Sequence, residues 1–218
     1  MNNGYSRIDL NSFVVNIRHP VGAGPYPVTI LLHGWTGDES SMWLFVKDRI
    51  KNHFIFSPRA PYPSKNQLKG GYSWTLLHTD HWPEVDDFIF SAKELLSLIE
   101  SLSKQYEGNF DVVNVVGFSQ GAALGYVFSM IYPEKVRRLV ALAGFLPDGS
   151  EKLLKHDQLQ GLPILIEHGI KDDIVPIELA RKAKGKLLKA GAEIDFIQLH
   201  GGHTVTKRGI SKITGFIM

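Results

Sequence analysis

The chain has 218 residues, of which 44% are hydrophobic and 21% are charged; this ordinary globular balance suits one domain with a sizeable core and argues against disorder. The formal net charge of +2 provides no strong electrostatic footprint for nucleic acid or an anionic membrane. The absence of cysteine excludes disulfides, thiolate catalysis and cysteine-bound zinc.

Short runs of β-forming residues alternate with helical patterns along the whole chain. Several of these runs are apolar throughout, as in strands that are buried on both faces of a parallel sheet. The spacing predicts strands at 12–18, 27–33, 53–57, 112–118, 138–144, 163–168 and 193–199, and helices at 39–51, 85–106, 120–131 and 177–190. Because strands and helices alternate, we expect residues 1–218 to form a single α/β domain, with a mostly parallel central sheet and helices on both faces.

Residues 58–83 stand apart because they are rich in proline, glycine and aromatic side chains and show no periodicity. A long irregular connection inside a compact domain is usually functional. Within it, we expect residues 62–82 to line the acyl pocket with the apolar surfaces of Tyr72, Trp74 and Trp82. The connection at 145–162 is too short for a large cap domain, so the expected site is open.

An apolar strand pattern ends in the sequence VVGFSQGAA, residues 115–123, where a helical pattern of small residues begins at once. Gly117, Ser119 and Gly121 form a G-x-S-x-G motif at this strand-to-helix turn. Such a turn is sharp, and side chains two positions before and after its centre would collide with neighbouring backbone, so both positions require glycine. This context favours Ser119 as an exposed nucleophile over an incidental serine in a glycine-flanked turn.

A serine nucleophile needs a base and an orienting acid, which in sheet enzymes of this type follow the serine in chain order. The later strand patterns lead into Asp172 and Asp173, and then into His200 and His203. Two glycines precede His203 and form a bend that can bring its ring over the serine, so we favour His203 over His200. Either aspartate can be the acid, and the other can cap the helix that begins near Pro176.

Backbone N–H groups are expected to stabilise the oxyanion. One would come from Gln120, directly after Ser119, and the other from Trp35, in the loop after the second predicted strand. Gly34 lets the chain turn so that the Trp35 amide can point at the serine. Asp38 is expected to cap the helix that follows this loop.

Six motifs occur in the order seen in the phospholipase/carboxylesterase family of α/β-hydrolases, which includes acyl-protein thioesterase-like enzymes and small bacterial carboxylesterases. They are LLHGWTGDE, SPRAPYP, GGYSW, GFSQGA, HGIKDDIVP and GGH, and the resemblance covers most of the chain. It implies an α/β-hydrolase fold without a cofactor, with Ser119, Asp172 and His203 as the catalytic triad. The D-x-x-V-P pattern of the family maps the acid onto Asp172, and the oxyanion amides map onto Trp35 and Gln120.

The chain departs from the family pattern at three places. Thr36 stands where bacterial members often have glycine, and we expect the threonine to stiffen the oxyanion loop. Ala122 replaces a frequent second glycine after the serine, and few residues follow His203, so the last helix must be short. None of these departures removes a catalytic part.

We therefore expect a serine hydrolase that cleaves small-molecule carboxylic esters through an acyl-enzyme. Cleavage of thioesters or lysophospholipids uses the same chemistry, and a non-catalytic binding protein with this fold is the alternative from another class. We expect no nucleic-acid partner and no cofactor. We also expect no metal, since His78 and His81 lack the carboxylate–histidine set of a metal site. The N-terminal residues lack an apolar leader pattern and no apolar run has membrane length, so we expect a soluble cytoplasmic protein. The sequence leaves the oligomeric state open.

Overall fold

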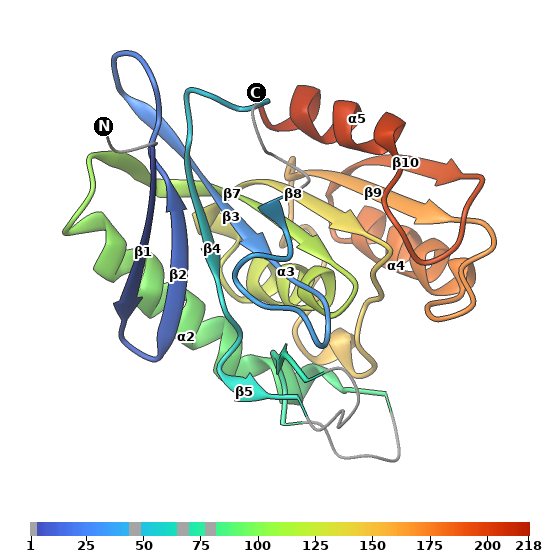
Figure 1. Cartoon of the computed structure of the whole chain (residues 1–218). Coiled ribbons are helices and arrows are strands. Elements are labelled where there is room, and N and C mark those ends of the chain that lie inside the picture. Colours follow the sequence, from blue (N-terminus) through green and yellow to red (C-terminus); the bar gives the residue numbers. More distant parts are fainter. Residues whose placement is uncertain (1–3, 44–48, 65–69, 77–81) are drawn as a thin grey trace.

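The computed structural model describes residues 4–43, 49–64, 70–76 and 82–218. Its centre is an eight-stranded sheet in the order β1-β2-β4-β3-β7-β8-β9-β10 (Figure 1). The strands are β1 (Tyr5–Leu10), β2 (Phe13–Arg18), β3 (Tyr26–Leu32), β4 (Phe54–Pro58), β7 (Gly108–Phe118), β8 (Val136–Leu142), β9 (Pro163–Gly169) and β10 (Glu193–Leu199). From β4 onward in this spatial order, neighbouring strands of the sheet pair in parallel, while β2 pairs antiparallel with both β1 and β4. The predicted mostly parallel sheet is confirmed.

Helices cover both faces of this sheet, as the alternating pattern predicted. They are α2 (Val85–Ser103), α3 (Gln120–Ile131), α4 (Ile177–Lys189) and α5 (Lys207–Ile217), with short 3-10 helices η1 (Pro133–Lys135) and η2 (Ser150–Lys152). Helices α2, α3 and α4 pack in one apolar layer, and α5 packs in the other. Among the described helices, none has both the length and the apolar character needed to cross a membrane.

Three elements differ from the sequence pattern. Strand β1 was not predicted because its side chains alternate between exposed and half-buried, which is a weak hydrophobic signal for an edge strand. The irregular segment contains a short antiparallel pair, β5 (Tyr62–Pro63) and β6 (Tyr72–Ser73). Of the helix predicted at 39–51, residues 44–48 lie outside the described part of the chain. Before them, residues 39–42 form turns and not the expected start of the helix. Asp38 therefore does not cap a helix that begins at residue 39, but it is structural, since its Oδ1 accepts a hydrogen bond from the Ser40 amide at 2.9 Å.

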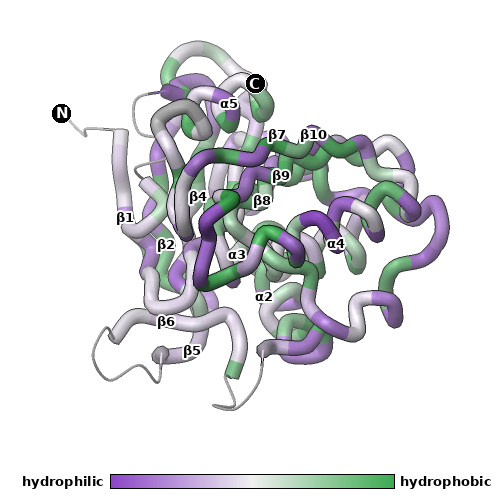
Figure 2. The backbone as a smooth tube through the Cα atoms, turned by 90° about the vertical axis from the view of Figure 1, so that its right-hand side faces the viewer, coloured by the Kyte–Doolittle hydropathy of each residue, from purple (hydrophilic) through white to green (hydrophobic). Residues whose placement is uncertain are grey.

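Alternate side chains of each central strand enter opposite apolar layers. Ile30 of β3 belongs to the layer under α2, α3 and α4, whereas its neighbour Leu31 belongs to the layer under α5, with Ile213 and Ile217. In Figure 2 hydrophobic residues run through the central strands, while hydrophilic residues recur along α4. The near-continuous apolar strand sequences thus have a physical cause, since both faces of these strands are buried.

An acidic side chain, Glu167 of β9, lies in the layer under α5. It lies opposite Leu142 and Ile197 on the two neighbouring strands and is only 3% exposed. Neither carboxylate oxygen has a hydrogen-bond partner among the described residues. A Cβ added at Gly209, in the first turn of α5, would lie 1.9 Å from Oε1, so the carboxyl group occupies the space that this glycine leaves. Burial raises the pKa of Glu167 from its ordinary value of 4.5 to about 7.

This burial predicts a pH dependence of stability. The unfolded chain releases the Glu167 proton at lower pH than the folded protein, so the free energy of unfolding should fall as pH rises from about 4.5 to about 7. Glu167→Gln keeps the shape without the titration. Its free energy of unfolding should equal that of the wild type near pH 4 and exceed it at pH 8 by on the order of 3 kcal/mol. Urea denaturation across this pH range measures the difference.

The exposed Glu107 provides a matched control, because Glu107→Gln should keep the pH slope of the wild type. If Glu167→Gln also keeps that slope, the buried carboxyl group is not its cause.

Candidate active site

The turn between β7 and α3 holds Ser119 in a strained backbone conformation, with φ 54° and ψ −116°. The flanking glycines permit it. A Cβ added at Gly117 would lie 2.4 Å from the carbonyl oxygen of Gly121, and one added at Gly121 would lie 2.2 Å from the carbonyl oxygen of Leu32. Both distances are far below van der Waals contact, so the steric requirement for two glycines that the sequence predicted is confirmed.

Three side chains from separate loops meet at the carboxyl edge of the sheet. His203 Nε2 lies 3.0 Å from Ser119 Oγ, and His203 Nδ1 lies 2.8 Å from Asp172 Oδ2. Asp172 follows β9, and His203 lies between β10 and α5. The imidazole also packs against the ring of Phe118, with 5.0 Å between the ring centres. His200 is exposed and stays outside this chain of contacts.

The carboxylate of Asp172 is fully buried and is held by several donors. Its Oδ1 accepts hydrogen bonds from the amides of Ile174 at 3.0 Å and Val175 at 2.8 Å, which leaves Oδ2 for His203. Charge-assisted bonds of this kind fix the orientation of a carboxylate. The acid is therefore oriented before any substrate arrives.

The neighbouring Asp173 does not have the role that the sequence suggested for it. Its side chain is exposed, and the N-cap position of α4 is Pro176, which makes no side-chain cap bond. The expectation that Asp173 caps this helix is wrong. The bonds from the loop amides go instead to Asp172, whose second oxygen binds the histidine.

A second histidine, His168, is buried beside the acid. Its Nε2 is 2.7 Å from the carbonyl oxygen of Val175, to which it donates, and 3.3 Å from Asp172 Oδ2. Burial lowers the pKa of His168, so the ring is neutral. A neutral neighbour leaves the negative charge of Asp172 for His203.

The β3 loop, residues 33–39, is fixed at its start by His33. The Nε2 atom of His33 accepts a hydrogen bond from the amide of Ala60 at 3.0 Å, so Nδ1 carries the proton and donates it to the carbonyl oxygen of Gly34 at 2.7 Å. Burial lowers the pKa of His33 to about 4, which keeps the ring neutral. This side chain anchors the loop and does not reach Ser119.

The middle of the β3 loop is strained and is held by β6. Thr36 has a φ of 68°, a conformation that a β-branched residue rarely adopts. The Thr36 amide donates to the carbonyl oxygen of Tyr72 at 3.0 Å, and the Tyr72 amide donates to the carbonyl oxygen of Gly37 at 2.9 Å. Glu39, at the end of the loop, forms a two-point ion pair with Arg59 at 2.6 and 2.7 Å. The non-glycine residue at position 36 is therefore restrained by contacts on both sides.

The backbone amides of Gln120 and Trp35 have no acceptor among the described residues. The amide of Gln120 is the first of α3, where the helix supplies no acceptor, and the described part of the chain offers none to the Trp35 amide. A Cβ added at Gly34 would lie 3.3 Å from Ser119 Cβ, so the β3 loop packs directly against the serine. Both amides thus belong to segments that meet at Ser119.

The three aromatic residues expected to line a pocket have different environments. Trp74 has no exposed surface, so the expectation that it contacts a substrate is wrong; its Nε1 donates to the carbonyl oxygen of His33 at 2.7 Å. Tyr72 is half-buried, and the guanidinium of Arg59 lies 4.5 Å from its ring centre. Trp82 is 48% exposed and packs edge-on against Phe145, with 4.9 Å between ring centres. The aromatic composition of this segment indicated that these side chains make apolar contacts, but it did not indicate whether the contacts are with the core, with other side chains or with a substrate.

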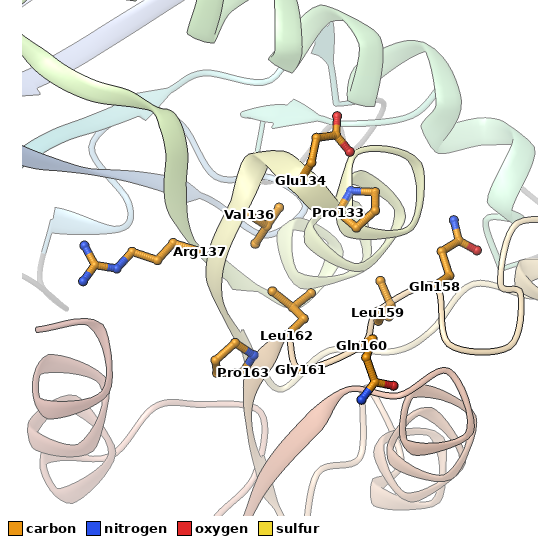
Figure 3. Close-up of a pocket in the computed structure, with 10 residues that line it drawn as sticks. All are labelled: Pro133, Glu134, Val136, Arg137, Gln158, Leu159, Gln160, Gly161, Leu162 and Pro163. Carbon is orange, nitrogen blue, oxygen red and sulfur yellow. The ribbon is translucent and has the colours of Figure 1, made fainter.

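A pocket of about 340 Å³ lies elsewhere, at the amino ends of β8 and β9 (Figure 3). Its lining includes Glu134, Arg137 and several amide and apolar side chains. None of these lining residues is a nucleophile with an adjacent base. No cluster of three or more potential metal ligands occurs among the residues that the structure describes. His78 and His81 lie outside those residues.

Residues 16–218 match a family model described as phospholipase/carboxylesterase. The chain belongs to this family. Family membership makes it a hydrolase, and the resemblance inferred from the six sequence motifs is confirmed. The chain is 32% identical to acyl-protein thioesterase 1 of Saccharomyces cerevisiae over 171 residues, which cover 71% of this chain and 74% of the yeast protein. It is 28% identical to the Kluyveromyces lactis protein of the same name over 170 residues, 72% and 74% of the two chains.

Solved structures of carboxylesterases share the fold of this phospholipase/carboxylesterase family member. A carboxylesterase from Mesorhizobium loti superposes with a TM-score of 0.82 at 19% identity and covers 98% of both chains. The Bacillus cereus carboxylesterase superposes with a TM-score of 0.79 at 20% identity, covering 99% of this chain and 94% of its own. The predicted α/β-hydrolase fold is confirmed.

Proposed function

We propose that the protein is a serine esterase that cleaves carboxylic esters through an acyl-enzyme, with Ser119, His203 and Asp172 as its catalytic triad. The observation that carries this proposal is the continuous hydrogen-bond chain from Asp172 Oδ2 through His203 to Ser119 Oγ, with distances of 2.8 and 3.0 Å. A nucleophile, a base and an orienting acid in mutual contact are the parts that acyl transfer requires. A non-catalytic binding protein would have no need for this arrangement.

In the first half of the reaction, Ser119 Oγ attacks the ester carbonyl carbon while His203 Nε2 accepts the hydroxyl proton. Asp172 accepts a hydrogen bond from His203 Nδ1–H and so keeps Nε2 available as the base. The resulting imidazolium gives its proton to the leaving alcohol as the carbon–oxygen bond breaks. Water then attacks the acyl-enzyme through the same steps, and the carboxylic acid and Ser119 are released.

The amides of Trp35 and Gln120 would stabilise the tetrahedral oxyanion. Each can donate one hydrogen bond to the oxygen atom on which negative charge develops. The N-terminus of α3 adds a positive dipole end beneath the same site. Preorganised donors of this kind contribute without reorganisation during the reaction.

Thioester cleavage is the second candidate function. The similarity to acyl-protein thioesterase 1 from two yeasts favours it, and the chemistry is the same because a thiolate replaces the alkoxide as leaving group. A matched pair of substrates with one acyl group, an oxygen ester and a thioester, separates the two activities by their kcat/KM ratio.

The two neighbouring aspartates provide a matched test of the triad. Asp172→Asn should lower kcat by roughly 10⁴-fold, as loss of the triad acid does in serine proteases, because the histidine then adopts the wrong tautomer. Asp173→Asn changes an exposed side chain and should keep kcat within about twofold. Ester hydrolysis is measured for both variants beside their melting temperatures. A folded Asp172→Asn variant with wild-type turnover would refute the triad.

Trp82 is proposed to bind the acyl chain of the substrate. It packs on Phe145, and a Cβ added at the preceding Gly144 would lie 3.5 Å from the carbonyl oxygen of Ser119, so the segment that carries Phe145 passes next to Ser119. Trp82→Ala should lower kcat/KM for an octanoyl ester roughly tenfold more than for an acetyl ester, because apolar contact is lost only with the longer chain.

Phe90 offers the control for this experiment, since it is an aromatic of similar exposure, 53%, on α2. Phe90→Ala should leave the chain-length profile unchanged. An identical profile in Trp82→Ala and the wild type would remove Trp82 from the acyl site.

A further inference from the structure

The side chain of Gln120 has a set of contacts separate from those of its backbone amide. The whole residue is only 4% exposed. Its Oε1 accepts from the amide of Trp74 at 3.0 Å, and its Nε2 donates to Ser73 Oγ at 3.0 Å and Thr75 Oγ1 at 3.1 Å. A buried amide group with partners at both ends has a single orientation. Gln120 therefore binds residues 73–75 to the start of α3.

The same segment binds the β3 loop on its other side. Trp74 Nε1 donates to the carbonyl oxygen of His33 at 2.7 Å, two residues before Trp35. The Thr36 amide, one residue after Trp35, donates to the carbonyl oxygen of Tyr72 at 3.0 Å. The amide of Trp35 is thus located between two anchors that residues 72–74 supply.

Trp74 is itself held at three points. Its amide donates to Gln120, its indole nitrogen donates to His33, and its carbonyl oxygen accepts from Ser91 Oγ at 2.5 Å. The ring also lies 5.0 Å from the ring of His33. A side chain fixed in this way transmits a displacement at one end to the other, because a packed core does not absorb it.

We propose that the side chain of Gln120 is a positioning residue, which acts through Trp74 to set the spacing between the two oxyanion amides. The inference rests on the proposed function, since it concerns the donors of that site. Gln120 contributes one donor through its backbone and aligns the other, Trp35, through its carboxamide. Donors must lie about 2.7–3.1 Å from the oxyanion to be effective. A small shift of the β3 loop therefore lowers the stabilisation of the transition state more than the affinity for the substrate.

A role confined to folding predicts different kinetics. If the buried carboxamide only stabilises the core, its removal lowers the melting temperature and leaves the turnover of the folded protein unchanged. If it positions the donors, kcat falls while KM stays nearly constant. The affinity for a transition-state analogue should fall by the same factor as kcat/KM, because both report stabilisation of the oxyanion.

Gln120→Met tests the proposal, because it keeps the backbone amide and a similar volume but removes the carboxamide bonds. We expect kcat for ester hydrolysis to fall roughly 10–100-fold, less than the 10²–10³-fold that follows loss of a whole donor, with KM within about threefold. The Ki of a trifluoromethyl ketone, which forms a tetrahedral oxyanion adduct with the serine, should rise by the same factor. Ser129→Ala is the control, since it removes another buried hydrogen bond of α3, to Gly125 at 2.8 Å; it should lower stability and leave kcat unchanged.

Trp74→Phe tests the same connection at its other end, since it removes the bond to His33 and keeps an aromatic ring. It should also lower kcat with little effect on KM. The double variant with Gln120→Met should be no slower than the slower single variant, because both changes break one connection. If Gln120→Met does not fold, the kcat of Trp74→Phe decides the question.

Wild-type kcat in either folded variant, or additive losses in the double variant, would overturn the positioning role. Absence of ester and thioester hydrolysis in the wild type would instead contradict the proposed function. The two failures are therefore distinguishable in one set of assays.

Discussion

The close packing of the β7–α3 turn against the end of β3 is the constraint on which the rest of the site depends. A Cβ at Gly121 would lie 2.2 Å from the carbonyl oxygen of Leu32, and one at Gly34 would lie 3.0 Å from the Phe118 ring. Chain segments can approach this closely only at glycine, which has no Cβ atom. Because β3 and β7 are neighbouring parallel strands, their carboxyl ends reach the same edge of the sheet. The sheet thus brings the strained Ser119 and the β3 loop together.

The electrostatic environment of the site follows from burial. His33 and His168 are buried and their pKa values are lowered, to about 4 for His33, so both rings act as neutral hydrogen-bonding groups. Asp172 is also buried, and its charge is stabilised by N–H donors from its own loop and from His203. His203 is the imidazole that contacts both the acid and the hydroxyl of Ser119. Burial therefore distinguishes the two structural histidines from His203, the proposed base.

Much of this arrangement could be predicted from the sequence, because parallel strands deliver residues at their carboxyl ends to one edge of the sheet. The order of serine, aspartate and histidine after successive strand patterns was sufficient to expect them together. The residues alone left Asp172 and Asp173 open, because the choice depends on how one loop turns; the family pattern selected Asp172. The burial of Trp74 could not be predicted, since an aromatic side chain suits a core and a pocket equally. Nothing in an apolar strand pattern indicates that the carboxyl group of Glu167 is buried without a hydrogen-bond partner in the described part of the chain.

The central claim is that Ser119 is a nucleophile activated by His203. A fluorophosphonate tests it most directly, because an activated serine oxygen forms a bond to phosphorus as fluoride leaves, whereas an ordinary serine hydroxyl does not react. Mass spectrometry of the labelled and digested protein should find one adduct per chain, on the peptide that contains Ser119. The adduct should be absent in Ser119→Ala and should form far more slowly in His203→Ala. A folded wild type that stays unlabelled, or an adduct that persists in Ser119→Ala, would contradict the account.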